Sequence, residues 1–280
     1  MKVGEILDFI NKLAPWDYAE TWDNVGLMVG SRHNGVKKVL LCMDVTSRVI
    51  REAIDCEAEL IVSHHPFLFS KLGKLDFDTI KGQQIQTLVT KDISVISAHT
   101  NLDVAAGGVN DTLAETIGLN GLRALKTYVP QGYDQNLGLG RTGTLENETD
   151  FNEFIDNIKK SLNIINLRVI GAHPDKVKKV AVFCGSFDVE LDYLRSLGQD
   201  VLITGDLKYH TALDAREMGL CIVDVGHFAS EHVILSKLQK LLADEFASIE
   251  VICSKMESDP FIFDISKFSN YNKLSKDVIL

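Results

Sequence analysis

Three short segments of the sequence combine histidine with a carboxylate or with a second histidine. They are Ser63-His64-His65-Pro66, His99-Thr-Asn-Leu-Asp103 and His227-Phe-Ala-Ser-Glu231. Imidazole and carboxylate ligands without thiolate suit Zn²⁺, Fe²⁺, Mn²⁺ or Co²⁺, and the residue types do not choose among these ions. Carboxylates can bridge two ions about 3.5–4 Å apart, as in two-metal hydrolases. The segments predict two divalent ions bound by His64, His65, Asp103, His227 and Glu231.

Each of these segments directly follows an apolar stretch that has the composition of a β-strand. His64 follows Leu60-Ile61-Val62, His99 follows a strand expected over 93–97, and His227 follows one expected over 220–225. In an open parallel sheet, ligands bind beyond the carboxyl ends of the strands. Two incidental loop histidines would explain the His-His pair alone equally well. Three strand ends with the same residue types favour a shared metal centre, with Asp103 and Glu231 as the natural bridges.

The remaining histidines have less defined roles. His99 ends a strand at the same edge, and an imidazole titrates near physiological pH, so we assign it as the candidate catalytic proton shuttle. The alternative for His99 is that it orients Asp103. His210 follows the strand expected over 200–204, where it would either contact substrate or be an ordinary helix residue.

The elements that must position these side chains alternate between strand and helix. Near-continuous apolar strands separated by helices indicate a parallel sheet covered on both faces, an α/β fold. We expect a helix at 151–161, a strand at 166–170, and a turn or hairpin in the Gly-rich stretch 137–145. The other strands are expected at 38–45, 59–63, 93–97, 179–183, 200–204 and 220–225, and helices at the N-terminus, 46–57, 78–91 and 187–197.

The two halves of the chain repeat. Val36-Lys37-Lys38-Val39 recurs 141 positions later as Val177-Lys178-Lys179-Val180, and the same offset maps 60–63 onto 201–204 without a gap. The same offset aligns Gly205 and Asp206 with His64 and His65. An offset of 128 aligns His99 with His227, each with an acid four residues later. We therefore expect two similar α/β units from an internal duplication, with the metal site in the cleft between them.

The duplication predicts that the chain is divided into three parts. Residues 1–123 form the first α/β unit with its N-terminal helix, and 124–225 form the second. Residues 226–280 complete the metal site and pack back on the first unit.

Composition limits the classes of function. With 280 residues and a net charge of −10, the chain lacks the clustered Lys and Arg that nucleic-acid binding requires. No apolar run approaches the ~18 residues of a membrane span, and the N-terminus has no signal-peptide pattern. Five scattered cysteines without a CxxC motif indicate a reducing compartment, so we expect a cytoplasmic protein without membrane partners, and Cys42 and Cys221 as core thiols.

Several motifs together resemble the Nif-three-like family. They run in order over about residues 3–262 and comprise the opening Leu13-Ala14-Pro15 with Ala19-Glu20-Thr21-Trp22-Asp23-Asn24-Val25-Gly26-Leu27, the three metal segments, Gly107-Gly108-Val109-Asn110-Asp111, Gly140-Arg141-Thr142-Gly143-Thr144-Leu145, and Thr204-Gly205-Asp206 with His210. The sequence departs from the family's glycine-richer turn at Phe183–Phe187, and the tail after about residue 263 has no counterpart. The segment 124–176 is too short for the mid-chain domain of some relatives, so the chain resembles the compact form.

The resemblance implies a dinuclear metal centre with the same five ligands and a toroidal homohexamer whose metal sites face an inner cavity. Members are often labelled GTP cyclohydrolase I type 2 homologues. A metal-dependent hydrolase acting on a nucleotide or another small phosphate-containing compound is the expected function. The alternative is a non-enzymatic protein for metal storage, delivery or regulation, because the same five ligands would serve that role.

Overall fold

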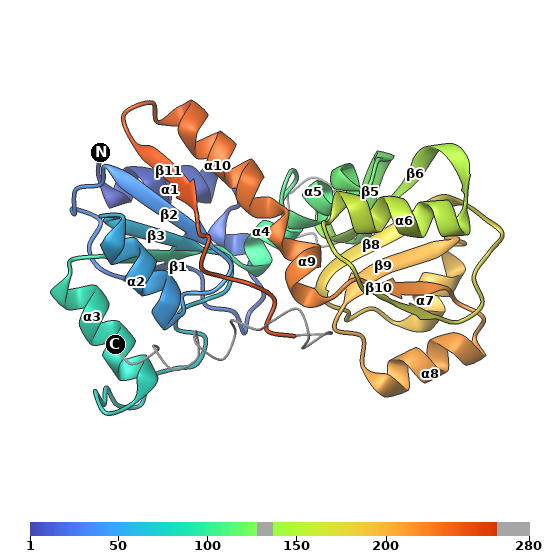
Figure 1. Ribbon diagram of the computed structural model, residues 1–280, viewed down its shortest axis with the longest axis horizontal. Helices are drawn as coiled ribbons and strands as arrows, with labels where there is room; N and C mark the ends of the chain where they lie inside the picture. Colours follow the sequence, from blue (N-terminus) through green and yellow to red (C-terminus); the bar gives the residue numbers. More distant parts are fainter. Residues whose placement is uncertain (128–136, 262–280) are drawn as a thin grey trace. The chain divides into compact units, whose positions relative to one another are not determined.

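The chain folds into two compact units in a computed structural model that describes residues 1–127 and 137–261 (Figure 1). The first unit comprises Met1–Leu102 and the segment from Leu235 onward, and the second comprises Asp103–Ile234. The chain therefore leaves the first unit after Leu102 and returns to it at Leu235. The tail after residue 263 lies outside the described residues.

These limits differ from the sequence-based division at 123/124 and 225/226. Helix α5 (Val109–Thr116) packs on the strands of the second unit, which draws 103–123 into that unit. Helix α9 (His227–His232) packs on the same sheet. The C-terminal strand β11 (Glu250–Cys253) instead pairs with the first sheet.

The first unit is built on a five-stranded sheet with the order β1-β4-β3-β2-β11. Strands β2 (Lys38–Cys42), β3 (Leu60–Ser63) and β4 (Ser94–Ser97) are parallel to one another and to β11. Only β1 (Gly26–Val29) is antiparallel, at the edge beside β4. The three expected strands are present, and their carboxyl ends meet at one edge of the sheet.

Helices cover both faces of this sheet. In Figure 1, α2 (Ser47–Asp55) and α3 (Ile80–Thr90) lie on one side, and α1 (Val3–Leu13) and α10 (Ile234–Glu245) lie on the other. Thr46 and Thr79 cap α2 and α3 by accepting hydrogen bonds from the third residue beyond them, which explains why these helices start there. The side chains of α2 and α3 pack on alternate sheet residues, and each buried aliphatic side chain stabilises the fold by about 1.5–3 kcal/mol.

The second unit is built on a six-stranded sheet with the order β5-β6-β8-β9-β10-β7. Its parallel centre consists of β8 (Lys176–Ser186), β9 (Val201–Gly205) and β10 (Ile222–Asp224). The antiparallel strands are β5 (Leu119–Thr127), β6 (Gly138–Asp150) and β7 (Arg168–Ile170).

The helices of the second unit are α5, α6 (Phe151–Ser161), α7 (Leu191–Ser196), α8 (Tyr209–Glu217) and α9. The short helix α4 (Thr100–Val104) spans the boundary between the units along the chain. Among the described residues, no helix combines the length and apolar character that crossing a membrane would need.

Strand register supports the internal duplication. Val39 pairs with Leu60 and Cys42 with Ser63 in the first sheet. The residues 141 positions later make the same pairs, Val180 with Val201 and Phe183 with Thr204. The antiparallel edge strand also repeats, because β1 flanks β4 just as β7 flanks β10. The expectation that 36–65 and 177–206 share one topology is confirmed.

The third strands repeat with a shift of one residue. Ser63 pairs with Ser97, whereas its counterpart Thr204 pairs with Asp224, an offset of 127 rather than 128. One extra residue therefore lies between the end of β10 and His227. Gly226 accommodates it with a φ of 88°, a left-handed conformation that favours glycine.

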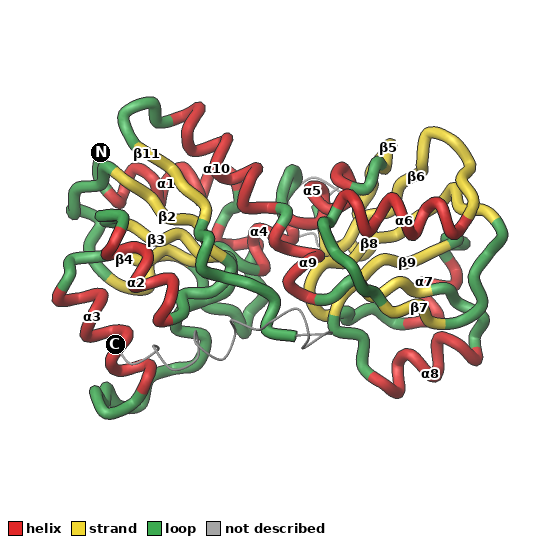
Figure 2. Tube along the Cα trace, in the orientation of Figure 1, coloured by secondary structure: helices red, strands yellow, loops and turns green. Residues whose placement is uncertain are grey.

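The Gly-rich stretch 137–145 was expected to be a turn or hairpin. Residues 138–145 lie in the long strand β6, drawn in yellow in Figure 2, which pairs antiparallel with the preceding strand β5. Its glycines permit close approach, since a Cβ on Gly138 would lie 2.1 Å from the carbonyl oxygen of Lys126. Residues 230–242 are divided between α9 and α10, and Glu231 is the fifth residue of α9.

The cysteine expectations are confirmed. All five cysteines are free, and Cys42 and Cys221 are buried in the two cores. Burial raises the pKa of both thiols, so they remain protonated and behave as small apolar side chains.

Candidate metal centre

The first unit presents His64 and His65 directly after β3. The pairing with β2 continues past Ser63, because the backbone amides of His64 and His65 donate to the carbonyls of Cys42 and Met43 at 3.0 and 2.9 Å. The hydroxyl of Ser63 donates to the carbonyl of His65 at 2.8 Å. The backbone of the double histidine is thus held rigidly at the carboxyl edge of the sheet.

His99 joins these two residues from the end of β4. The ring centroids are 5.0 Å apart for His64 and His65, 5.3 Å for His64 and His99, and 5.6 Å for His65 and His99. One nitrogen from each ring lies within 4.8 Å of the others. Three imidazoles at this spacing form a potential metal-binding group that includes His99, which the sequence assigned to proton transfer.

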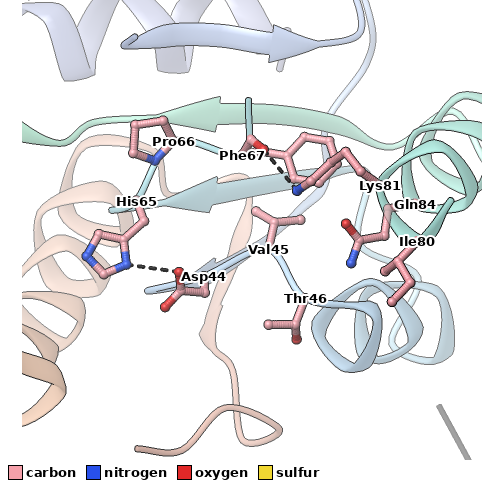
Figure 3. Close-up of a pocket in the computed structure, with 9 residues that line it drawn as sticks. All are labelled: Asp44, Val45, Thr46, His65, Pro66, Phe67, Ile80, Lys81 and Gln84. Carbon is pink, nitrogen blue, oxygen red and sulfur yellow. Dashed lines mark hydrogen bonds and ion pairs between the residues drawn. The ribbon is translucent and has the colours of Figure 1, made fainter. Parts of the chain in front are cut away.

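The Nδ1 atoms of these histidines are all held by oxygen acceptors. The partners are Ala98 O for His64 at 2.9 Å, Asp44 Oδ1 for His65 at 3.0 Å and Asp23 Oδ1 for His99 at 2.9 Å. Figure 3 shows the bond between His65 and Asp44. A hydrogen bond from Nδ1 fixes the tautomer and the ring orientation, so Nε2 is the nitrogen that would bind a metal.

Asp23 is held as a carboxylate by its neighbours. Its side chain is buried, and it accepts hydrogen bonds from Nδ1 of His99 and from the backbone amide and hydroxyl of Thr100. Burial acts to raise the pKa of Asp23, but the hydrogen bonds from His99 and Thr100 and the charge of His99 outweigh burial and lower the pKa to about 2. An ionised carboxylate therefore lies beside Nδ1 of His99.

In the second unit, His227 and Glu231 face each other across one turn of α9. Nε2 of His227 lies 3.0 Å from Oε2 of Glu231, and Nδ1 lies 2.8 Å from Oδ2 of Asp206. Asp206 follows β9 and is the counterpart of His65 in the duplication. The second copy thus uses its acid at this position to orient a histidine, the arrangement common behind metal-bound imidazoles.

The carboxylates of Asp103 and Glu231 both lie close to the thiol of Cys184. Sγ of Cys184 lies 3.4 Å from Oδ1 of Asp103. Burial raises the pKa of the Cys184 thiol, and the charges of Asp103 and Glu231 raise it further, so the thiol is protonated and donates to the carboxylate. Asn110 fixes the backbone here, because its side chain donates to Asp103 O at 3.1 Å and accepts from Cys184 N at 3.0 Å.

Glycine residues make room for His227 and Glu231 in the second unit. A Cβ on Gly185 would lie 2.2 Å from Oε1 of Glu231, and a Cβ on Gly205 would lie 2.8 Å from Cα of His227. Gly185 has a φ of 64° and is the counterpart of Asp44 in the duplication. The carboxylate of Glu231 therefore occupies space that a side chain at position 185 would fill, which gives a physical reason for the difference between the copies.

The structure accordingly groups the predicted site residues within each unit. His64 and His65 lie together in the first unit, with His99 beside them. Asp103, His227 and Glu231 belong to the second. His210 is exposed in the first turn of α8 and its ring packs edge-on against Tyr209.

Sequence reasoning missed the carboxylates that orient three of the histidines. Asp44 follows the strand β2 and Asp206 follows β9, so their strand-end positions were a usable signal. Asp23 lies in the motif Trp22-Asp23-Asn24, but nothing in its local sequence connects it to His99, 76 positions later.

Comparison with known proteins agrees with this architecture. The chain is 43% identical over 265 residues to a Clostridium perfringens protein named GTP cyclohydrolase 1 type 2 homolog, covering 94% of this chain and 100% of that protein. A Bacillus subtilis protein of the same name is 28% identical over 364 aligned positions, covering 92% and 98% of the two chains. That alignment is longer than the 280 residues of this chain, which is therefore a compact form.

The same fold occurs in a crystal structure of a Bacillus cereus protein related to NIF3. The TM-score is 0.86 at 28% sequence identity, and the match covers 94% of this chain and 99% of the other. The family model for Duf34/NIF3 (NGG1p interacting factor 3) matches residues 1–260, which include both sheets and every histidine and carboxylate described above. The chain belongs to the Duf34/NIF3 family.

Proposed function

We propose that this protein binds two divalent metal ions through His64, His65, Asp103, His227 and Glu231. The observation that supports the proposal is the orientation of the histidines: in His64, His65 and His227, Nδ1 contacts an oxygen acceptor, which leaves Nε2 as the nitrogen available to bind a metal. For His65 and His227 the acceptor is a carboxylate, which an imidazole that served only packing would not need. The family resemblance supports the same five ligands.

We further propose that the bound ions serve hydrolysis of a small phosphate-containing compound such as a nucleotide. Two bound ions would supply Lewis acidity, which lowers the pKa of water and polarises a substrate oxygen. His99 would exchange a proton with the substrate or with water through Nε2, while Asp23 holds its Nδ1–H. The relatives named GTP cyclohydrolase 1 type 2 homolog support GTP as one compound to test.

Metal content tests the first proposal. Protein purified without chelator and dialysed against Zn²⁺, Mn²⁺, Fe²⁺ or Co²⁺ is expected to hold about two ions per chain by elemental analysis. His65→Ala is expected to lose at least one ion, whereas the matched variant of the exposed His210, His210→Ala, retains both. A metal content near zero in the unaltered protein after supplementation contradicts the proposal.

Substrate turnover tests the second proposal, hydrolysis. Metal-loaded and chelator-treated protein are compared against GTP, nucleoside phosphates and simple phosphate esters, and product formation is expected only in the metal-loaded sample. His99→Gln is expected to lower turnover while retaining two ions; loss of an ion would instead make His99 a ligand. Full metal loading without turnover of any compound would favour the alternative, a protein for metal storage, delivery or regulation.

A homohexamer is the proposed assembly, on the basis of the family resemblance. Size-exclusion chromatography with light scattering is expected to give about six times the chain mass of 31.1 kDa. A stable monomer at micromolar concentration contradicts this assembly.

A further inference from the structure

A pocket of about 410 Å³ adjoins His65 within the first unit. We call it the His65 pocket. Figure 3 shows its lining: His65 and Pro66 at one end, Thr46 at the start of α2, and Ile80, Lys81 and Gln84 on α3. A volume of this size lies within the range that small-molecule sites occupy, roughly 300–1,000 Å³.

Two helices begin at this pocket. Thr46 is the N-cap of α2, and Ile80 and Lys81 are the first two residues of α3. A helix N-terminus carries a partial positive charge of about half an elementary charge, which favours anions. Neither helix has an acidic residue in its first turn, where such a residue would commonly balance that charge.

Lys81 adds a full positive charge at a position where the helix dipole disfavours it. Its ammonium donates to the carbonyl of Phe67 at 3.0 Å and lies 3.9 Å from the centroid of the Phe67 ring. Within 1–127 and 137–261, no carboxylate forms an ion pair with it. Burial lowers the pKa of Lys81, and the charge of Asp44 only partly opposes this shift. The half-buried cation has no carboxylate in direct ion-pair contact among the described residues, and an anionic ligand would supply such a partner.

Gln84 gives an independent indication of a ligand. The residue is only 6% exposed, and Nε2 donates to the hydroxyl of Ser47 at 3.1 Å. Its Oε1 is buried and has no hydrogen-bond partner among the described residues. In Figure 3 the amide end of Gln84 points inward from α3, toward Val45 and Thr46. Turning the amide over would keep the Ser47 bond, because a hydroxyl donates or accepts, and would present an N–H donor instead.

Asp44 is the one acidic residue among the described residues that line the pocket. Its carboxylate is engaged with Nδ1 of His65 at 3.0 Å. A cation held by Nε2 of His65 would balance that negative charge through the imidazole. The remaining polar groups of the pocket, Lys81 and the two helix ends, then favour an anion.

We propose that the His65 pocket binds the phosphate group of the substrate, beside the metal ligand His65. This inference rests on the proposed function, and it defines the substrate as a small molecule that carries a phosphate next to the bond that reacts. Lys81 and the amides at the start of α2 and α3 neutralise the phosphate, and Gln84 bonds one of its oxygens, accepting from a protonated oxygen or donating to an ionised one.

Phosphate binding to the full-length protein tests the inference, first metal-free and then loaded with Zn²⁺, because a cation on His65 would offset the charge of Asp44. Inorganic phosphate is titrated by ³¹P NMR or calorimetry, with acetate as a second ligand. Saturable phosphate binding is expected, weakened about tenfold or more by Lys81→Gln. The matched control is Lys91→Gln, at the exposed far end of the same helix α3, which is expected to bind phosphate like the unaltered protein. Equal loss in both variants, or unchanged affinity in Lys81→Gln, overturns the inference.

Three further outcomes separate this inference from the proposed function. Acetate binding as tightly as phosphate would overturn the phosphate assignment. Phosphate binding that requires added metal and ignores Lys81 would place the anion on the metal and also overturn it. The metal content of Lys81→Gln is measured in parallel and is expected to be unchanged, so a failure of metal binding in the unaltered protein would refute the proposed function alone.

Discussion

Nδ1 of His99 lies 2.9 Å from Oδ1 of Asp23, a residue 76 positions earlier in the chain. The bond joins the end of β4 to the loop that precedes β1. Because Asp23 is held ionised, with a pKa of about 2, it fixes His99 with the proton on Nδ1. A histidine so oriented is suited either to bind a metal or to accept a proton through Nε2.

The first prediction concerns the pH dependence of this pair. The folded-state pKa of Asp23 is lowered from 3.8 to about 2, so its stabilisation is fully present above about pH 4 and is lost as the pH falls through about 2. After allowance for solvent screening, Asp23→Asn should cost about 1–2 kcal/mol at pH 6 and less at pH 3.

Urea unfolding of metal-free protein at both pH values measures this difference. Asp17→Asn, which changes an exposed carboxylate in the same region, serves as the control and should cost less than about 0.5 kcal/mol. A cost for Asp23→Asn that grows toward low pH would refute the assignment.

The second prediction concerns Asp103. Asp103→Ala should release at least one of the two proposed ions, because the variant loses a proposed bridging carboxylate while Asn110 still holds the backbone carbonyl at this position. Elemental analysis measures the loss, and far-UV circular dichroism should show an unchanged fold. Asp192→Ala, on the exposed surface of α7, should keep both ions. Retention of both ions by Asp103→Ala would remove it from the ligand set.

The strand ends that carry the histidines could be predicted because their signal is local. Apolar stretches such as 60–63 and 201–204 have few alternatives to a buried parallel strand, and the shared offset of 141 anticipated the common register of the two sheets. The positions of His64 and His65 follow from that register alone, because each is one or two residues past a strand.

The carboxylates that hydrogen-bond to Nδ1 of the histidines could not be predicted in the same way, because only the tertiary structure brings each one to its histidine. Asp23 and His99 meet only after β1 has paired with β4. The one-residue shift before His227 depends on Gly226 adopting a positive φ, which sequence alignment of the two copies does not show. Strand β6 was missed since its glycines resemble a turn, although they permit the close packing around β5.

The third prediction concerns Arg141, which is buried in β6. Its guanidinium donates to both carboxylate oxygens of Asp111, at 3.0 and 2.6 Å, and to the carbonyls of Gly138 and Gly140. Arg141→Met would leave a partly buried carboxylate and the carbonyls that accept from the guanidinium without this donor, so the free energy of unfolding should fall by about 3–5 kcal/mol. Arg141→Lys should recover little of the lost free energy of unfolding, since an ammonium cannot make the paired hydrogen bonds of a guanidinium.

Urea unfolding measures both variants. Arg123→Met changes an exposed arginine on the adjacent strand β5 and should alter stability by less than about 0.5 kcal/mol. If Arg141→Met were as stable as Arg123→Met, the buried ion pair would have no structural importance.

The last prediction compares two glycines that share a conformation but differ in surroundings. Gly185 has a φ of 64° and Gly198 a φ of 59°, so alanine introduces similar backbone strain, about 1 kcal/mol, at either position. A Cβ at Gly185 would lie 2.2 Å from Oε1 of Glu231, whereas one at Gly198 would meet nothing within 4 Å. Gly185→Ala must therefore displace the carboxylate of Glu231, and Gly198→Ala must not.

If Glu231 is a metal ligand, this displacement should weaken metal binding by about 10- to 100-fold, the range seen when groups that position a ligand are disturbed. Equilibrium dialysis with Zn²⁺ and Mn²⁺ measures the affinity, and thermal unfolding of the metal-free proteins checks that both variants are folded at the temperature of the dialysis. Equal metal affinity in the two variants would show that Glu231 does not bind metal through this carboxylate. A selective loss in Gly185→Ala would explain why the second copy has glycine where the first has Asp44: the space is needed for a ligand that arrives from α9.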